Sequence, residues 1–155
     1  MAITNKGKYR ILEAIFNGGS LPATFYAALI TSAAAPTVDT NTFGELTEIA
    51  AGNGYTTGGT SLSKNSTDFP TITEDDTNNL AKINVKNLTW TASGGTIPAS
   101  GSGARYLILT DANATVSSRE VWAWWDLGGN KSIATGQTLT IGDASSPIQI
   151  QLADS

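Results

Sequence analysis

The 155-residue sequence contains no cysteine and no histidine. Without cysteine there is no disulfide bond and no thiolate ligand for a metal. Without histidine the usual Ser-His-Asp and Cys-His catalytic arrangements and the common zinc sites are excluded. We therefore expect a protein that is not an enzyme and that carries no cofactor and no metal.

Charged side chains are also scarce. They make up 14% of the chain, against roughly 25% in an ordinary soluble domain. A surface with few hydrated charges suits dense packing against neighbouring proteins, although a secreted β-protein with a Thr-rich surface has the same composition. The net charge is −4, and the few basic residues are scattered, which argues against binding to nucleic acid.

Long apolar runs are missing as well. None approaches the roughly 20 residues that span a bilayer, and the N-terminus lacks the pattern of a signal peptide. The sequence therefore predicts a soluble protein without a membrane partner.

The last third of the chain carries the clearest structural pattern, because apolar and polar residues alternate there in short runs separated by turn residues. In the final run, Ile148, Ile150 and Leu152 alternate with two glutamines, so on a strand the apolar residues point to one face and the glutamines to the other. A chain of this length is long enough for one domain with a hydrophobic core. We expect a mainly β fold, an antiparallel, jelly-roll-like β-sandwich over residues 1–155. Its predicted strands include residues 105–110, 120–127, 138–141 and 148–152.

Residues 1–20 read as an N-terminal arm with one short α-helix over residues 5–17. Leu12, Ile15 and Phe16 fall on one face of that helix, and Gly18-Gly19 is a plausible stop. The next run, residues 24–31, is apolar at both parities, which predicts a strand covered on both faces. The helix is a candidate cover for one of them.

Residues 32–79 form a long polar excursion that we expect to contain one or two short strands and to be functional or ordered by a partner. In residues 80–92 the apolar parity switches at Lys86-Asn87. Such a switch predicts a β-bulge or a sharp bend.

Two acidic segments are weak candidates for chemistry. The cluster Glu74-Asp75-Asp76 offers paired carboxylates but is more typical of a solvated turn. Asp111 and Asn113 resemble the start of a calcium loop, yet the glycine and the bidentate glutamate of that motif are missing. A weak structural cation at Asp111 and Asn113 stays open.

Tryptophans and cations supply the candidate interface residues. On a regular strand Trp122 and Trp124 share one face, where they either stack on a sugar or are buried under a sheet or subunit; we favour burial. Lys6, Lys8 and Arg10 begin the predicted helix in an otherwise acidic protein, so they are the natural contact for an acidic partner surface. A solvated helix start is the alternative.

The order of motifs along the chain resembles that of small virion proteins of tailed bacteriophages, of the tail-fibre-like or capsid-decoration kind. The motifs are LPATFYAALIT at 21–31, ELTEI at 45–49, GY at 54–55, LTWTA at 88–92, LILTDA at 107–112, VWAWWDL at 121–127, GQTLTI at 136–141 and IQIQL at 148–152.

This resemblance implies a β-sandwich that is made in the host cytoplasm and assembled in many copies on the virion, as homotrimers. The expected function is a capsid decoration, or cement, protein that binds the major capsid protein or other virion proteins on the capsid surface. The alternative is a tail-fibre or adhesion module that binds a host-surface glycan.

Overall fold

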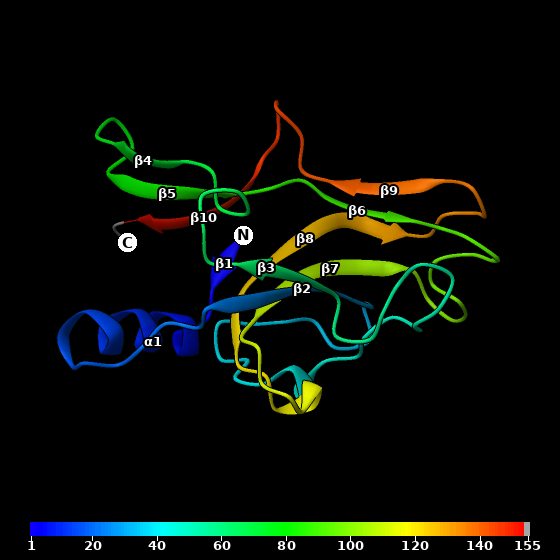
Figure 1. Ribbon diagram of the computed structural model, residues 1–155, viewed down its shortest axis with the longest axis horizontal. Coiled ribbons are helices and arrows are strands. Elements are labelled where there is room, and N and C mark those ends of the chain that lie inside the picture. The colour runs from blue at the N-terminus through cyan, green and yellow to red at the C-terminus, as the bar shows by residue number, and fades with distance from the viewer. Residues whose placement is uncertain (154–155) are drawn as a thin grey trace.

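In the computed structural model, which describes residues 1–153, the strands are stacked in two layers and one helix lies at the N-terminal end (Figure 1). The helical elements are α1 (Asn5–Phe16), η1 (Phe43–Glu45) and η2 (Val116–Ser118). The strands are β1 (Ala2–Ile3), β2 (Thr24–Ile30), β3 (Thr60–Ser63), β4 (Ile72–Asp75), β5 (Leu80–Val85), β6 (Leu88–Thr91), β7 (Ala104–Thr110), β8 (Val121–Lys131), β9 (Thr138–Ile141) and β10 (Ile148–Ala153).

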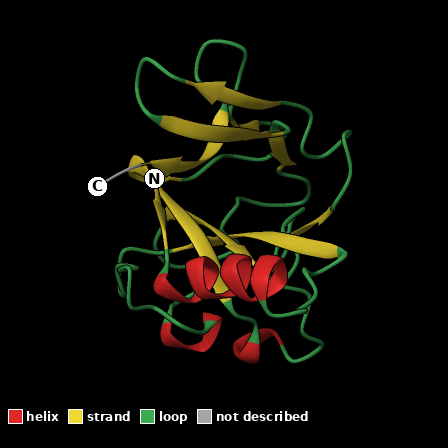
Figure 2. Ribbon diagram, turned by 90° about the vertical axis from the view of Figure 1, so that its left-hand side faces the viewer, coloured by secondary structure: helices red, strands yellow, loops and turns green. Residues whose placement is uncertain are grey.

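One layer is a five-stranded sheet with the order β1-β8-β7-β2-β3. The other layer consists of two small sheets, β10-β5-β4 and β6-β9, which lie above the five-stranded sheet in Figure 2. Every pairing within these sheets is antiparallel. The predicted β-sandwich with one N-terminal helix is confirmed.

The alternating runs of the last third are strands, as predicted: they correspond to β7, β8, β9 and β10. The parity switch at Lys86-Asn87 falls between β5 and β6, where the chain leaves one small sheet and enters the other. Val85 before the switch and Leu88 after it are both buried. The bend therefore keeps apolar side chains directed into the core on both sides of it.

The main core lies between the two layers. It draws on strands from all three sheets, for example Leu29 on β2, Trp90 on β6 and Ile148 on β10. The indole N–H of Trp125 on β8 donates a hydrogen bond of 2.9 Å to the carbonyl of Gln149 on β10. This bond joins the layers directly, beyond their apolar contact.

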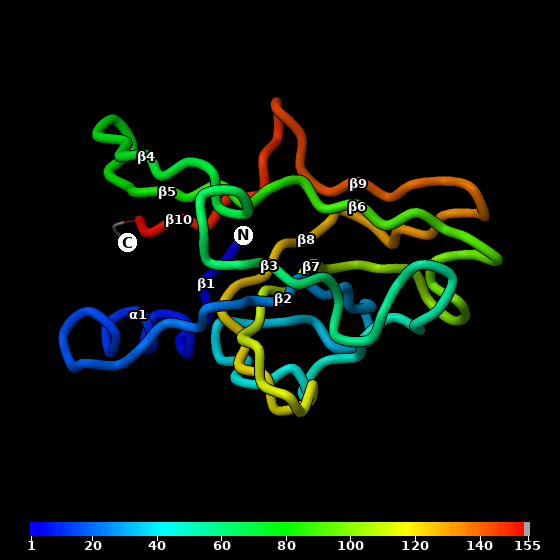
Figure 3. The backbone as a smooth tube through the Cα atoms, viewed as in Figure 1, coloured from blue at the N-terminus to red at the C-terminus, as the bar shows by residue number. Residues whose placement is uncertain are grey.

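A second cluster lies on the other face of the five-stranded sheet. Ala28 and Ile30 of β2 pack there with Ile108, Val121 and Phe43. The cover consists of the loops around η1 (cyan) and η2 (yellow), which lie beneath that sheet in Figure 3. β2 is thus covered on both faces, as predicted, but the helix is not the cover of this second face.

The predicted excursion, residues 32–79, contains η1, β3 and β4, so its two short strands agree with the prediction. It is anchored by buried side chains, among them Phe43, Ile49 and Tyr55. None of the helices in residues 1–153 combines the length and the apolarity needed to cross a bilayer.

Strand β8 contains a β-bulge at Trp122. Leu109 of β7 pairs with Ala123, and the next residue, Thr110, pairs with Val121. Trp122 is the extra residue between these pairs, and an extra residue shifts the inward set of a strand by one. Trp122 and Ala123 consequently both face the main core.

The bulge also fixes the start of α1. The Trp122 carbonyl accepts a hydrogen bond of 3.0 Å from the Thr4 amide, and the Thr4 hydroxyl caps the helix by accepting from the Gly7 amide at 3.0 Å. A Cβ on Gly7 would lie 2.5 Å from the Trp122 carbonyl oxygen. Only glycine permits this close approach of helix and strand.

Replacing Gly7 by alanine should destabilise the protein. Alanine is the better helix former by about 1 kcal/mol, so a net loss isolates the collision with the Trp122 carbonyl. We expect a loss of roughly 1–3 kcal/mol, as for other overpacked sites, measured by denaturant unfolding. Gly129→Ala is the matched control, because a Cβ there meets nothing within 4 Å; equal stability of the two variants would contradict the account.

Candidate functional site

The side of α1 that faces away from the sheets is apolar. Leu12, Ile15 and Phe16 are spaced to share one helix face, and they are 57%, 65% and 80% exposed. We call these three residues the outer face of α1. Large contiguous apolar surface is uncommon on proteins that function alone and marks a binding surface.

The orientation of α1 follows from its contact with β8. Gly7 is buried, and Ile11, one turn later, packs against the main core. Because these two residues take the inward side, the outer face of α1 is left without a partner among residues 1–153. The helix was a candidate cover for the strand at residues 24–31, but it packs against β8, and Leu12, Ile15 and Phe16 cover no strand among the described residues.

The predicted basic contact is largely neutralised within the molecule. Arg10 donates from Nε and Nη2 to the two carboxylate oxygens of Glu120, at 2.7 Å each, and from Nη1 to Glu13 at 2.6 Å. The Nζ of Lys6 lies 3.8 Å from Glu120 Oε1. Lys8 is exposed. Two of the three predicted cations thus hold α1 against β8 and its preceding turn.

This ion pair perturbs the titration of its members. The Arg10 guanidinium, by hydrogen bonding, lowers the pKa of Glu120 below its ordinary value of 4.5. Hydrogen bonds from Arg10 and then from Tyr9 lower the pKa of Glu13 in the same way. Both carboxylates are therefore ionised at neutral pH, where they accept the hydrogen bonds from Arg10.

The two candidate tryptophans do not share a face, contrary to the expectation from a regular strand, because the bulge lies between them. Trp122 is 7% exposed and packs edge-to-face on Phe25, with ring centroids 5.2 Å apart. Trp124 is half-buried on the opposite face against Tyr106, at 5.9 Å. Burial of Trp122 is confirmed, and the pair forms no common stacking platform.

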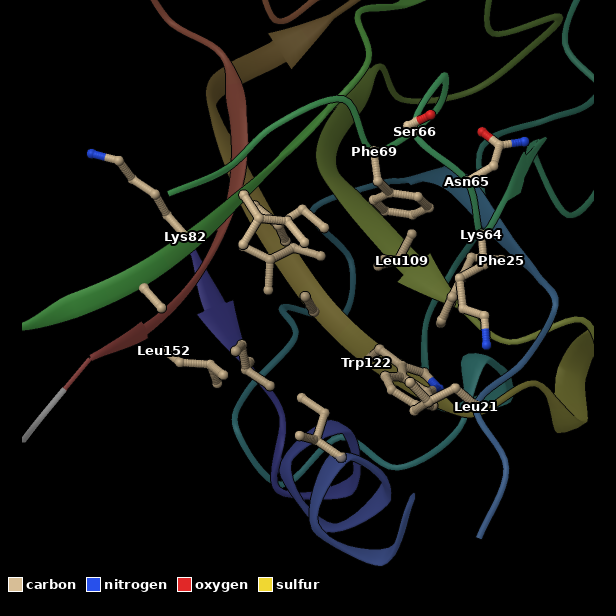
Figure 4. A pocket seen from close by; sticks show the side chains of 17 residues that line it. Leu21, Phe25, Lys64, Asn65, Ser66, Phe69, Lys82, Leu109, Trp122 and Leu152 are labelled. Atoms are coloured by element: carbon tan, nitrogen blue, oxygen red, sulfur yellow. The ribbon is translucent and has the colours of Figure 1, made fainter. Parts of the chain in front are cut away.

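A pocket of about 520 Å³ opens between the layers beside α1 (Figure 4). Its walls come from several elements, including Ile11 of α1, Trp122 of β8 and Ile150 of β10. No local pattern in the sequence predicts this pocket, because its lining residues are far apart in the chain. The glycine inside the predicted helix was the one local signal of an unusually close packing contact.

The buried polar groups of the excursion have structural partners. Glu48 accepts hydrogen bonds from the Tyr55 hydroxyl at 2.7 Å and from the Gly58 amide at 2.6 Å, and burial raises its pKa. Arg119 donates to the Gly58 carbonyl at 2.9 Å and stacks on the Tyr26 ring at 3.8 Å. These contacts tie the excursion to the sheet.

The acidic segments have structural partners: Glu74 and Asp75 end strand β4, and Asp76 begins the turn that follows it. Asp75 forms an ion pair of 3.1 Å with Lys82, and hydrogen bonds from Asn78 and then from Lys82 lower its pKa. Asp111 accepts from the amide of Glu120 at 2.9 Å, and Asn113 accepts from the amide of Thr115. Among residues 1–153 no three acidic side chains gather as a set of metal ligands.

Comparison of the chain with protein-family models, with curated proteins and with solved structures finds no match.

Replacing Glu120 by glutamine should reduce stability at neutral pH and flatten its dependence on acid. Because the folded-state pKa of Glu120 is lowered, the contribution of the ion pair is complete above the ordinary carboxyl pKa and is lost as the pH falls through the folded value. Denaturant unfolding should thus give parent and variant curves that converge in acid. Glu74→Gln, on the exposed strand β4, is the control and should follow the parent; a Glu120→Gln deficit that is constant with pH would refute the assignment.

Proposed function

We propose that this protein is a non-enzymatic structural protein of a bacteriophage virion, a decoration protein that docks on the capsid through the outer face of α1. The observation that carries the proposal is that unpartnered apolar helix face. The resemblance in motif order supports the virion setting, and the β-sandwich architecture is compatible with it.

The energetics favour a protein partner for this face. Complete burial of a Leu, Ile or Phe side chain is worth roughly 1.5–3 kcal/mol each, so three such side chains together supply a useful share of a binding free energy. The net gain is smaller, because association also costs rotational and side-chain freedom. Linkage of several such faces in one oligomer raises the affinity above that of a single face.

The contact surface proposed here lies on the same helix as the predicted cations, but on a different side from Lys6 and Arg10. Arg10 and Lys6 are engaged by Glu120, so their charges are already compensated inside the molecule. An apolar contact is less sensitive to salt than one formed by surface charges. Attachment that persists in high salt therefore favours the outer face of α1 over a basic contact.

The capsid is the preferred location over the tail. The glycan-binding alternative relied on loops or on a tryptophan pair, and the pair offers no platform because Trp122 and Trp124 lie on opposite faces of the sheet. A copy number on purified particles that is comparable with that of the major capsid protein supports decoration. A much smaller number favours a tail element.

We further propose that the protein assembles as a homotrimer, because closed symmetry hides exposed strand edges such as that of β3. Light scattering gives the mass directly. A species that persists at the monomer mass of 16.1 kDa at high concentration contradicts this proposal.

The double variant Ile15→Ser/Phe16→Ser should fold normally and fail to attach to particles that lack the protein. Both side chains are largely exposed, so their loss should change the free energy of unfolding by less than about 0.5 kcal/mol each. Attachment is measured by co-sedimentation with particles at low and high salt.

Lys131→Ser is the control, because Lys131 is exposed and ends strand β8, away from α1. It should attach as the parent does. Normal attachment of the double variant, or loss of attachment by Lys131→Ser alone, would show that the outer face of α1 is not the contact.

A further inference from the structure

We propose that the pocket between the layers binds a single-chain aliphatic carboxylic acid, with the carboxylate at the Lys64 end and the alkyl chain inside. This inference is independent of the proposed virion function. It rests on the size of the pocket, on its apolar walls and on two nitrogen donors that have no acceptor.

The pocket has the dimensions of a small-molecule site. Its volume of about 520 Å³ falls in the range of roughly 300–1,000 Å³ that is typical of such sites. Aliphatic side chains from both layers line it, among them Ile83, Leu109 and Ile150. An unbranched alkyl chain gains burial along these walls without leaving a polar atom unpaired.

Two donors stand at one end. The Trp122 side chain is more than nine-tenths buried, and its indole N–H has no hydrogen-bond partner. Lys64 also lines the pocket and forms no ion pair with another of the described residues, whereas Lys82, on the far side, is paired with Asp75. Figure 4 shows Lys64 and Trp122 at the same end of the pocket, next to Leu21.

These donors define the head group. A buried N–H without an acceptor is costly, and a carboxylate accepts from both an indole N–H and an ammonium group. A cationic head is repelled by Lys64, and a plain hydrocarbon leaves the buried indole N–H unpaired and gains nothing from the exposed ammonium group of Lys64. A monocarboxylate is the chemistry that matches both the donors and the apolar walls.

The test is isothermal titration of the isolated protein with octanoate, decanoate and dodecanoate below their critical micelle concentrations. Affinity should rise about fourfold for each added methylene until the pocket is full. Dodecanol and dodecyltrimethylammonium, with the same chain and a neutral or cationic head, should bind at least tenfold more weakly than dodecanoate. Equal affinity for the three heads, or no binding of any of them, would overturn the proposal.

Variants separate the head contact from the tail contact. Lys64→Ala should weaken dodecanoate binding at least tenfold and leave dodecanol binding unchanged. Trp122→Phe keeps the ring contacts and removes the N–H, so it should also act on the carboxylate alone. Ala81→Phe narrows the pocket from β5 and should weaken both ligands.

Lys131→Ala, at the exposed end of β8, is the control and should bind as the parent does. The melting temperature of each variant confirms that it is folded before titration. Undiminished dodecanoate binding by folded Lys64→Ala and Trp122→Phe would overturn the assignment of the head group. Undiminished binding by folded Ala81→Phe would place the ligand outside this pocket.

Discussion

The carbonyl group of Trp122 is the contact on which the rest of the structure depends. It lies in the β-bulge of β8 and accepts the Thr4 amide, while Gly7 packs against it where a larger residue cannot. The bulge directs the side chains of Trp122 and Ala123 into the core and sends Trp124 to the opposite face. One irregular residue thus sets the core on one side of the sheet and the rotation of α1 at its end.

The surface of the molecule follows from that rotation. Gly7 and Ile11 take the inward side of α1. The three large apolar side chains of the outer face of α1 therefore face the solvent. The Arg10–Glu120 pair then locks the helix in this orientation. These three exposed side chains form the surface through which we propose that the protein attaches to its partner.

Local patterns in the sequence predicted the strands well, because alternation at residues 148–152 and the parity switch at Lys86-Asn87 report directly on which side chains face the core. They failed where one contact between distant segments decides the outcome. The bulge at Trp122 changes the faces of the tryptophans, and the packing of Gly7 changes the inward side of α1. Neither the bulge nor this packing contact produces a periodic pattern of apolar residues in the sequence. The pocket was missed for the same reason, since Ile11 and Ile150 meet only in the folded chain.

The account is tested most directly by covalent surface footprinting of the outer face of α1, read by mass spectrometry on the protein alone and on the protein bound to particles. Ile15 and Phe16, the two most exposed apolar side chains of the helix, should be labelled strongly in the protein alone and protected on particles. Buried Leu29 should stay unlabelled in both states. Protection of Ile15 and Phe16 in the protein alone, or unchanged labelling on particles, would contradict the claim that this face is exposed for docking.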